Sequence, residues 1–99
     1  MFVRTDLPLA QQIVQAVHAA YEAGRDYARD APENDQRFSV VICQIPNEQK
    51  LLFEYERLRS NGVVATLFRE PDIGSQATAF ATEPVADRKF FSRYQLWKG

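Results

Sequence analysis

The sequence has few of the features that mark specialised classes of protein. Its single cysteine, Cys43, cannot form an internal disulfide and is typical of a reducing compartment. No apolar run approaches the ~20 residues that a membrane-spanning helix needs, and the N-terminus lacks the charged-then-apolar pattern of an export signal. One histidine and one cysteine without a dense acidic cluster are too few ligands for a metal site. We therefore expect a soluble, cytoplasmic protein without membrane contact.

Charge of one sign is also lacking over most of the chain. Twelve basic and thirteen acidic side chains give a net charge of −1, which argues against a strongly electrostatic nucleic-acid binder. Residues 88–99 contain four basic side chains and no acid, so the remainder of the chain holds eight basic and thirteen acidic ones. This positive tip on a negative body is able to meet phosphate, although uneven surfaces also occur without any partner. No glycine-rich phosphate loop is present.

The 99 residues predict one domain, 1–99, with a single core. Strands are predicted at residues 2–5, 38–45, 63–68 and 78–82, and helices from residue 8 to 24 or 29, from 46 to 61 and from 84 to 92. Residues 94–97 are available as an additional edge strand. The apolar runs at 38–45 and 63–68 suit strands covered on both faces, as in a parallel sheet. The face that we expect the first helix to turn inward consists of Leu9, Ile13, Ala16, Val17 and Ala20.

This βαβαββα order predicts the α/β class, as a three-layer α/β/α sandwich with a small mixed sheet. Ligands in such sheets gather at the carboxyl ends of the strands. Those ends are "RTDLP", "QIPN" and "REPDIG". The first leads into a polar row of the first helix and the third is an acidic loop, so we expect that row and that loop to converge on one pocket.

The polar row consists of Gln11, Gln15 and His18, at spacings of four and three. A surface helix usually fills such a line with Lys and Glu, whereas this one presents two amides and the only imidazole. Two interpretations are open: an uncharged stretch of solvated surface, or side chains that face a site needing directional hydrogen bonds. For His18, which precedes two alanines, a packed and hydrogen-bonded histidine is the alternative to a catalytic one.

These segments together resemble the type-2 peptidyl-tRNA hydrolases, the archaeal and eukaryotic class. The first strand of that family ends V-R-x-D-L and leads into a helix with A-Q-x-x-H-A; here "VRTDL" is followed by "VQAVHA". After the second helix the family reads roughly G-L-P-T-x-L-I-x-D-A-G, then a T-Q pair and a T-x-x-x-x-x-P strand exit. The corresponding segments here are "GVVATLFREPDIGSQ" and "TAFATEP". The matching positions at the N-terminus are Arg4, Asp6, Leu7, Gln15, His18 and Ala19.

Two departures from the family pattern bear on activity. The family helix carries a Gly-Lys pair before A-Q, and its lysine belongs to the active site; this chain has Gln11-Gln12 there and no lysine before Lys50. The D-A-G loop is altered too. An ungapped alignment places the family aspartate at Glu70, and a shifted one places it at Asp72. Turn formation beside a proline is the alternative reason for both acids.

The resemblance implies hydrolysis of the ester that joins a peptide to the terminal ribose of tRNA, without a cofactor. Such a reaction needs a positioned water, a proton acceptor and donors for the oxyanion. A carboxylate is able to position the water and accept its proton. Neutral amides and hydroxyls supply hydrogen-bond donors, and an arginine is able to replace the missing lysine. The candidate catalytic residues are Glu70, Asp72, Gln15 and His18, and the candidate substrate-binding residues are Gln11, Gln76, Thr78, Arg4 and Arg69.

Three functional alternatives remain open at this point. The chain is a hydrolase that acts on peptidyl-tRNA, a non-enzymatic relative that binds RNA ends or another protein, or a purely structural dimerising domain. The tail "RKFFSRYQLWK" interleaves basic and aromatic residues. Its aromatic rings are expected to stack on RNA, to pack against the sheet, or to form the surface of a homodimer, which the resemblance also implies.

Overall fold

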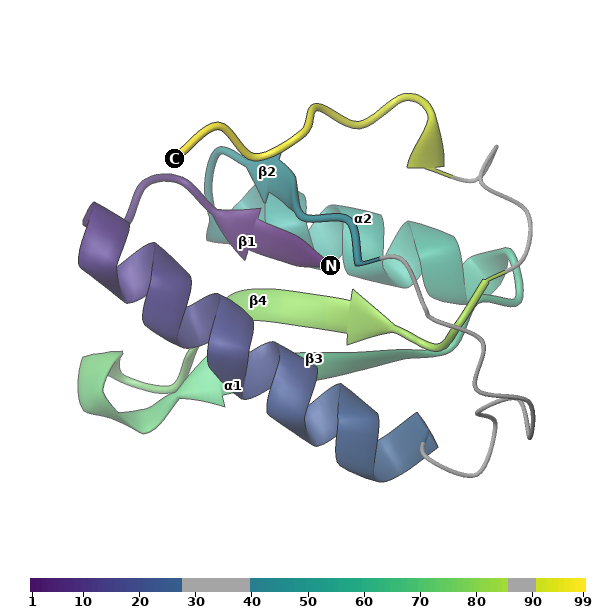
Figure 1. Ribbon diagram of the computed structural model, residues 1–99, viewed down its shortest axis with the longest axis horizontal. Coiled ribbons are helices and arrows are strands. Elements are labelled where there is room, and N and C mark those ends of the chain that lie inside the picture. Colours follow the sequence, from purple (N-terminus) through teal and green to yellow (C-terminus); the bar gives the residue numbers. More distant parts are fainter. Residues whose placement is uncertain (28–39, 86–90) are drawn as a thin grey trace.

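The computed structural model describes residues 1–27, 40–85 and 91–99 (Figure 1). Helices and strands alternate along the first half of the chain, and two strands follow in succession. The elements are β1 (Phe2–Arg4), α1 (Leu9–Tyr27), β2 (Cys43–Ile45), α2 (Glu48–Ser60), β3 (Ala65–Glu70), the short 3-10 helix η2 (Pro71–Ile73) and β4 (Gln76–Thr82). None of the helices in these ranges is both long enough and apolar enough to cross a bilayer.

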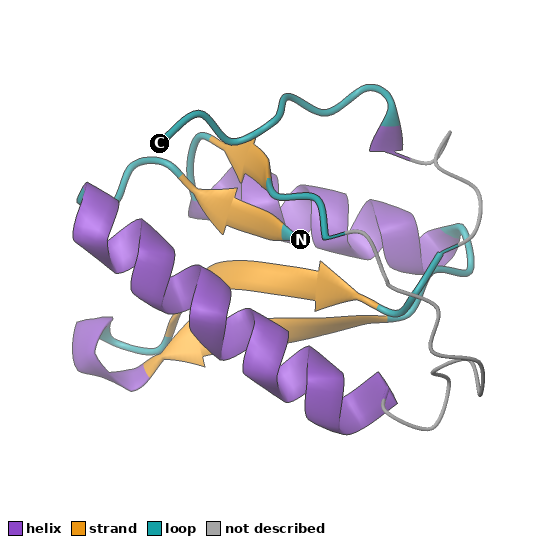
Figure 2. Ribbon diagram, viewed as in Figure 1, coloured by secondary structure: helices purple, strands orange, loops and turns teal. Residues whose placement is uncertain are grey.

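The four strands form one mixed sheet in the order β2-β1-β4-β3 (Figure 2). Strands β1 and β2 are parallel, whereas β4 is antiparallel to both of its neighbours, β1 and β3. The predicted α/β class with a small mixed sheet is therefore confirmed.

The two helices cover opposite faces of the sheet. Adjacent residues of a strand point to opposite faces, and in β1 the ring of Phe2 packs in the core beneath α2 while Val3 packs beneath α1. The ring of Phe2 stacks on Phe80 of β4 with centroids 4.4 Å apart. Figure 1 shows α1 crossing before the sheet and α2 behind it. These are the three expected layers.

Local signals in the sequence fix the limits of α2. The side chain of Asn47 accepts a hydrogen bond from the Lys50 amide at 2.8 Å and caps the first turn. The helix ends at Asn61-Gly62, where Gly62 has a φ of +85°, a conformation that costs glycine little.

Two strands differ from their predicted form. Only Cys43–Ile45 of the range 38–45 is a strand; Val40 is 73% exposed, and residues 38–39 lie outside the described part. Strand β3 lies at an edge of the sheet and is half-buried, not fully covered. In both cases the apolar run belongs to an outer strand of the sheet. An outer strand has a neighbouring strand on one side only, so its side chains are less completely covered.

The inward face predicted for α1 is wrong. Leu9, Ile13 and Val17 are 51%, 51% and 62% exposed, and the residues that α1 buries are Gln12, Gln15, Ala19 and Ala23. The physical reason lies in β4, which presents alanines at positions 79 and 81 to α1. Small residues on both sides let the helix lie close to the sheet, and its larger side chains remain outside.

The C-terminal segment runs along β2 (Figure 1). Leu96 forms an isolated antiparallel bridge with Cys43, and the Trp97 amide donates to the Ile42 carbonyl at 2.8 Å. The expected edge strand at 94–97 is thus reduced to one bridge. The half-buried rings of Phe91, Tyr94 and Trp97 pack against the two cores, which is the packing interpretation of the aromatic tail.

The predicted ends of two helices are also affected. Gly24 lies inside α1, and its possible extension to residue 29 lies outside the described residues. At the predicted last helix, Pro84 and Val85 are not helical, and residues 86–90 lie outside the described part.

Candidate functional site

The candidate site lies at the sheet edge where β1, β2 and β3 end. Strand β3 runs antiparallel to β4, and β4 runs antiparallel to β1, so β3 points the same way as β1 and β2. Their carboxyl ends meet at this edge together with the first residue of β4 and the first turn of α1, at the left of Figure 1. As predicted, the polar row of α1 and the loop after β3 come into contact, through the hydrogen bond between Gln15 and Glu70.

Gln15 is the centre of this contact. Its side chain is completely buried, and Nε2 donates to Oε2 of Glu70 at 2.9 Å and to Oε1 of Gln11 at 3.2 Å. Its Oε1 accepts from the hydroxyl of Thr78 at 2.8 Å. Because an ionised carboxylate only accepts hydrogen bonds, Glu70 fixes the orientation of the amide. Both hydrogens of Gln15 are then used inside the protein.

A β-bulge turns Thr78 toward Gln15. Phe68 pairs with Ala79 and Arg69 pairs with Ala77, so Thr78 is an extra residue in β4 with no partner in β3. In a regular strand Thr78 shares the face of Phe80, which is the α2 side; the bulge instead directs its hydroxyl to α1. Bulges commonly re-aim a side chain in this way beside functional sites.

Glu70 has both carboxylate oxygens engaged in part. Oε2 accepts from Gln15, and Oε1 accepts from the Asp72 amide at 3.2 Å, which caps η2. These bonds, in that order of importance, and the nearby imidazole of His18 hold the pKa of Glu70 below its usual 4.5. The carboxylate is ionised at neutral pH and keeps lone pairs for a further donor such as water.

Asp72 lies two residues further along the chain, in η2, and is exposed. The carboxylate that touches α1 is therefore Glu70, which is the position that the ungapped alignment gives to the family aspartate. The loop closes through Gly74 and Ser75, with φ angles of +73° and +59°, and Ser75 is the only non-glycine with a positive φ among the described residues. Backbone strain of this kind often gathers at functional loops.

His18 lies flat on a ring of β3. Its imidazole is parallel to Phe68 within 1°, with centroids 4.6 Å apart. The residue is exposed, on the same side of α1 as Gln11, which is also exposed. Phe68 thereby fixes the plane of the imidazole near Glu70.

Arg4 forms a separate, structural cluster next to this centre. The residue is 6% exposed, and its Nε and Nη2 donate to the two oxygens of Asp6, each at 2.8 Å. Its Nη1 donates to Oε1 of Gln76 at 2.9 Å and to the Ala77 carbonyl at 3.0 Å. Asp6 raises the pKa of Arg4, and Arg4 lowers that of Asp6, chiefly by this paired hydrogen bond. Arg4 thus ties β1 to the start of β4.

The remaining candidates lie around the rim of the site. Gln76 is exposed at the start of β4, paired in register with Glu70. Arg69 is exposed, and its Nη1 donates to the Ser75 carbonyl at 3.2 Å. Within the described ranges no ion pair includes Glu70, so neither Arg4 nor Arg69 neutralises it in this conformation.

Two further residues at this end of the sheet, Gln12 and Glu48, were not predicted from the sequence. Gln12 is buried; its Nε2 donates to the Leu7 carbonyl at 2.7 Å, and its Oε1 accepts from the Trp97 indole at 2.8 Å. Glu48 accepts from the Ala77 amide at 2.7 Å, within the segment that the bulge disturbs. Three glutamines, Gln11, Gln12 and Gln15, stand close together in the sequence. The sequence gives no signal that Gln12 and Gln15 are buried while Gln11 is exposed.

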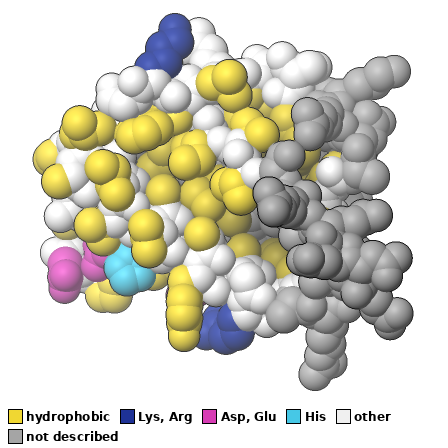
Figure 3. Space-filling model, viewed as in Figure 1, with side chains coloured by type: hydrophobic (Ala, Val, Ile, Leu, Met, Phe, Trp, Pro, Cys, Tyr) yellow, Lys and Arg dark blue, Asp and Glu magenta, His cyan; other side chains and the backbone are white. Residues whose placement is uncertain are grey.

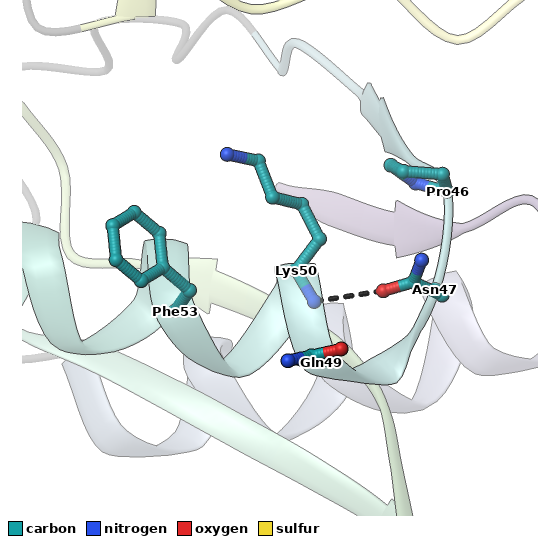
Figure 4. Close-up of a pocket in the computed structure, with 5 residues that line it drawn as sticks. All are labelled: Pro46, Asn47, Gln49, Lys50 and Phe53. Atoms are coloured by element: carbon teal, nitrogen blue, oxygen red, sulfur yellow. Dashed lines mark hydrogen bonds between the residues drawn. The ribbon is translucent and has the colours of Figure 1, made fainter.

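A hollow lies on the α2 side. This open pocket of about 380 Å³ is lined by Pro46, Asn47, Gln49, Lys50 and Phe53 (Figure 4). The Lys50 ammonium lies 5.0 Å from the centroid of the Phe53 ring. None of the candidate residues predicted from the sequence lines it.

Next to this pocket, α2 and the C-terminal segment share a cluster of charged and polar side chains around the buried Glu54. Glu54 accepts from the Tyr94 hydroxyl at 2.5 Å and from Arg57 Nε at 2.8 Å, and Lys50 lies 3.1 Å away. Burial alone raises the pKa of Glu54, but the hydrogen bonds outweigh it and lower the pKa to about 2. Burial also raises the pKa of Tyr94. The cluster is a structural tie between two segments that are distant in the sequence.

Comparison of the chain with models of known protein families, and with curated protein sequences, finds no match. The resemblance to the peptidyl-tRNA hydrolases therefore stays a prediction. In the described ranges no three His, Cys, Asp or Glu side chains are grouped so that they could hold a metal ion.

Proposed function

We propose that the protein is a hydrolase of the peptidyl-tRNA hydrolase kind, cleaving the ester between a peptide or N-acyl-amino acid and tRNA. The observation that carries the proposal is the hydrogen bond between the buried Gln15 amide and the Glu70 carboxylate. It joins two segments 55 residues apart in the sequence, both of which belong to the resemblance, and it leaves a carboxylate ionised at the carboxyl edge of the sheet.

We assign to Glu70 the role of binding and deprotonating the attacking water. Its free lone pairs accept a hydrogen bond from a water molecule whose oxygen attacks the ester carbonyl carbon, and the water proton passes to the carboxylate. As the tetrahedral intermediate collapses, the bond to the ribose oxygen breaks and that oxygen takes the proton. The products are a peptide acid and tRNA with a free hydroxyl.

Gln15 is a positioning residue in this scheme, because both of its N–H groups are already bonded. The oxyanion donor that we assign is the amide of Gln11. Its Oε1 accepts from Gln15, so its Nε2 points away from that bond, and the side chain is exposed. A neutral amide replaces a cation here. Since the loss of one oxyanion donor costs other enzymes about 10²–10³ in rate, we expect slow turnover.

The test is release of free tRNA from a peptidyl- or N-acyl-aminoacyl-tRNA by the purified protein. We expect Glu70→Gln to abolish release and Asp72→Asn, in the same loop, to retain it. Loss in Asp72→Asn alone would move the water-binding role two residues along the loop. If the unmodified protein releases tRNA no faster than the variant that carries both changes, hydrolysis is rejected.

A second candidate function is binding of RNA ends without turnover. It is favoured by the internal satisfaction of Gln15 and Arg4, whose polar atoms mainly bond to the protein itself. This function gives saturable binding of tRNA that weakens steeply with salt, with no release of product. If the protein neither binds tRNA nor releases product, the remaining alternative is the purely structural role. In each case we propose that the protein works in the cytoplasm as a homodimer.

A further inference from the structure

The outward side of α1 is entirely apolar, the reverse of an ordinary surface helix. At 100° per residue, eight residues between positions 9 and 24 fall within about 140° of the helix circumference, opposite the buried side. All eight are exposed and none is polar. We call them the α1 stripe: Leu9, Ala10, Ile13, Val14, Val17, Ala20, Tyr21 and Gly24. Figure 3 shows hydrophobic side chains gathered on this face of the molecule.

The α1 stripe is at the upper end of the apolar patches that a monomer exposes, and patches of this size are often functional. Five of its members are large side chains, with exposures from 43% for Val14 to 75% for Tyr21. Together they offer on the order of 500 Å² of apolar surface, which is near the largest patch of a typical monomer. With the small residues between them this approaches the ~800 Å² that each partner buries in a standard interface.

The shape of the α1 stripe suits a copy of itself. Leu9, Ile13, Val17 and Tyr21 are spaced four apart and form a ridge along the helix, and Ala20 and Gly24 form a row of small residues beside it. Nothing lies within 4 Å of a Cβ built on Gly24, so this row is open. Two such helices pack with the ridge of each in the shallow row of the other.

The charge pattern argues against a charged partner. From residue 9 to residue 21 the helix has no acidic or basic side chain apart from the single histidine, which lies beside the stripe. An RNA or an acidic or basic peptide would find no counter-charge on it. An apolar, self-complementary surface instead suits a two-fold contact, in which the same patch serves both copies.

We infer that a second copy of this chain docks on the α1 stripe, so that two α1 helices pack against each other across a two-fold axis. The inference stands whether or not the protein is a hydrolase. It moves the dimer surface from the aromatic tail, whose Phe91, Tyr94 and Trp97 pack within the chain, to the first helix. Gln11 and His18 flank the stripe, so the partner borders each candidate site.

The test compares two charge substitutions at equally exposed helical positions. Val17→Glu lies in the α1 stripe (62% exposed), and Phe53→Glu lies on α2 (59% exposed). In analytical ultracentrifugation we expect the unmodified chain to sediment at twice its mass of 11.4 kDa, Val17→Glu to be a monomer and Phe53→Glu to remain a dimer. A monomeric unmodified chain, or equal behaviour of the two variants, would overturn the inference.

A cysteine variant tests the same contact without adding charge. Val17 is near the middle of the stripe, so in a two-fold contact it meets its own copy. Cys43 is the only native thiol and is buried. We expect Val17→Cys to form a disulfide-linked dimer under mild oxidation and Val64→Cys, an exposed site in the connection before β3, to stay monomeric on a non-reducing gel. Equal cross-linking of both variants counts against the α1 stripe.

Discussion

The hydroxyl of Thr78 donates to Oε1 of Gln15 at 2.8 Å, and both residues are completely buried. This bond depends on the bulge that adds Thr78 to β4. It satisfies the amide oxygen of Gln15, while Glu70 and Gln11 accept from the nitrogen. The position of the Glu70 carboxylate therefore depends on a residue that itself does not touch the carboxylate.

Replacing Thr78 by valine removes this hydroxyl at nearly constant volume. The buried Gln15 oxygen then lacks a donor, and we expect the free energy of unfolding to fall by about 1–3 kcal/mol, the cost of one unsatisfied buried polar group. Urea denaturation measures the change. Thr66→Val is the matched control, since the Thr66 hydroxyl bonds to the exposed Asp26 carboxylate; an equal loss in both variants would contradict the role of burial.

The order of the elements from β1 to β4 was predictable because each of them carries its own local signal. Asn47 and Gly62 limit α2, and the apolar segments mark the strands. The convergence of α1 with the loop after β3 was predictable too, because strand direction alone brings carboxyl ends to one edge. The contact of Gln15 with Glu70 is the result of that topology.

The buried side of α1 was not predictable from hydrophobicity. An amphipathic helix usually turns its large apolar side chains inward, but here close packing of Ala19 and Ala23 on β4 excludes them. The bulge at Thr78 leaves no mark in a strand of regular appearance, so its choice of face was not predictable either. Both depend on the fit between elements distant in the sequence.

Gln12 joins α1 to the C-terminal segment through the Trp97 indole, at 2.8 Å. Trp97 is the only tryptophan of the chain, so its fluorescence reports this bond. We expect Gln12→Ala to shift the emission to longer wavelength and to lower the free energy of unfolding by about 1–3 kcal/mol, because the indole and the Leu7 carbonyl lose their partner. Gln11→Ala, at the exposed neighbouring position, should leave the emission unchanged; a shift there as well would argue against a specific bond.

Glu54 makes stability depend on pH in acid. Its folded pKa of about 2 lies below the ordinary 4.5, so the unfolded chain binds more protons between these values and stability rises with pH across them. The stabilisation is complete above about pH 5 and is lost as the pH falls toward 2. We expect the unfolding midpoint in urea to fall over this range.

Glu54→Gln provides the control for this dependence. A neutral amide at this position cannot titrate, so the contribution of Glu54 to the pH dependence disappears and the curve between pH 2 and 5 becomes flatter than that of the unmodified chain. The variant is also less stable at neutral pH, because Arg57 and Lys50 lose their buried counter-ion. A curve of unchanged slope would assign the acid sensitivity to other carboxylates.

Gln11 is the position at which a cation is missing by comparison with the family pattern, and the structure places it one hydrogen bond from Gln15 and two from Glu70. A lysine there brings a positive charge to the edge where the ester oxyanion would form. We expect Gln11→Lys to raise hydrolysis, or tRNA affinity, at least about tenfold, a fraction of the 10²–10³ that one oxyanion donor supplies elsewhere. Gln49→Lys adds the same charge to an exposed glutamine of α2 and should do neither. Equal gains from both variants would mean general attraction to phosphate, and no gain from either would contradict the alignment of the first helix.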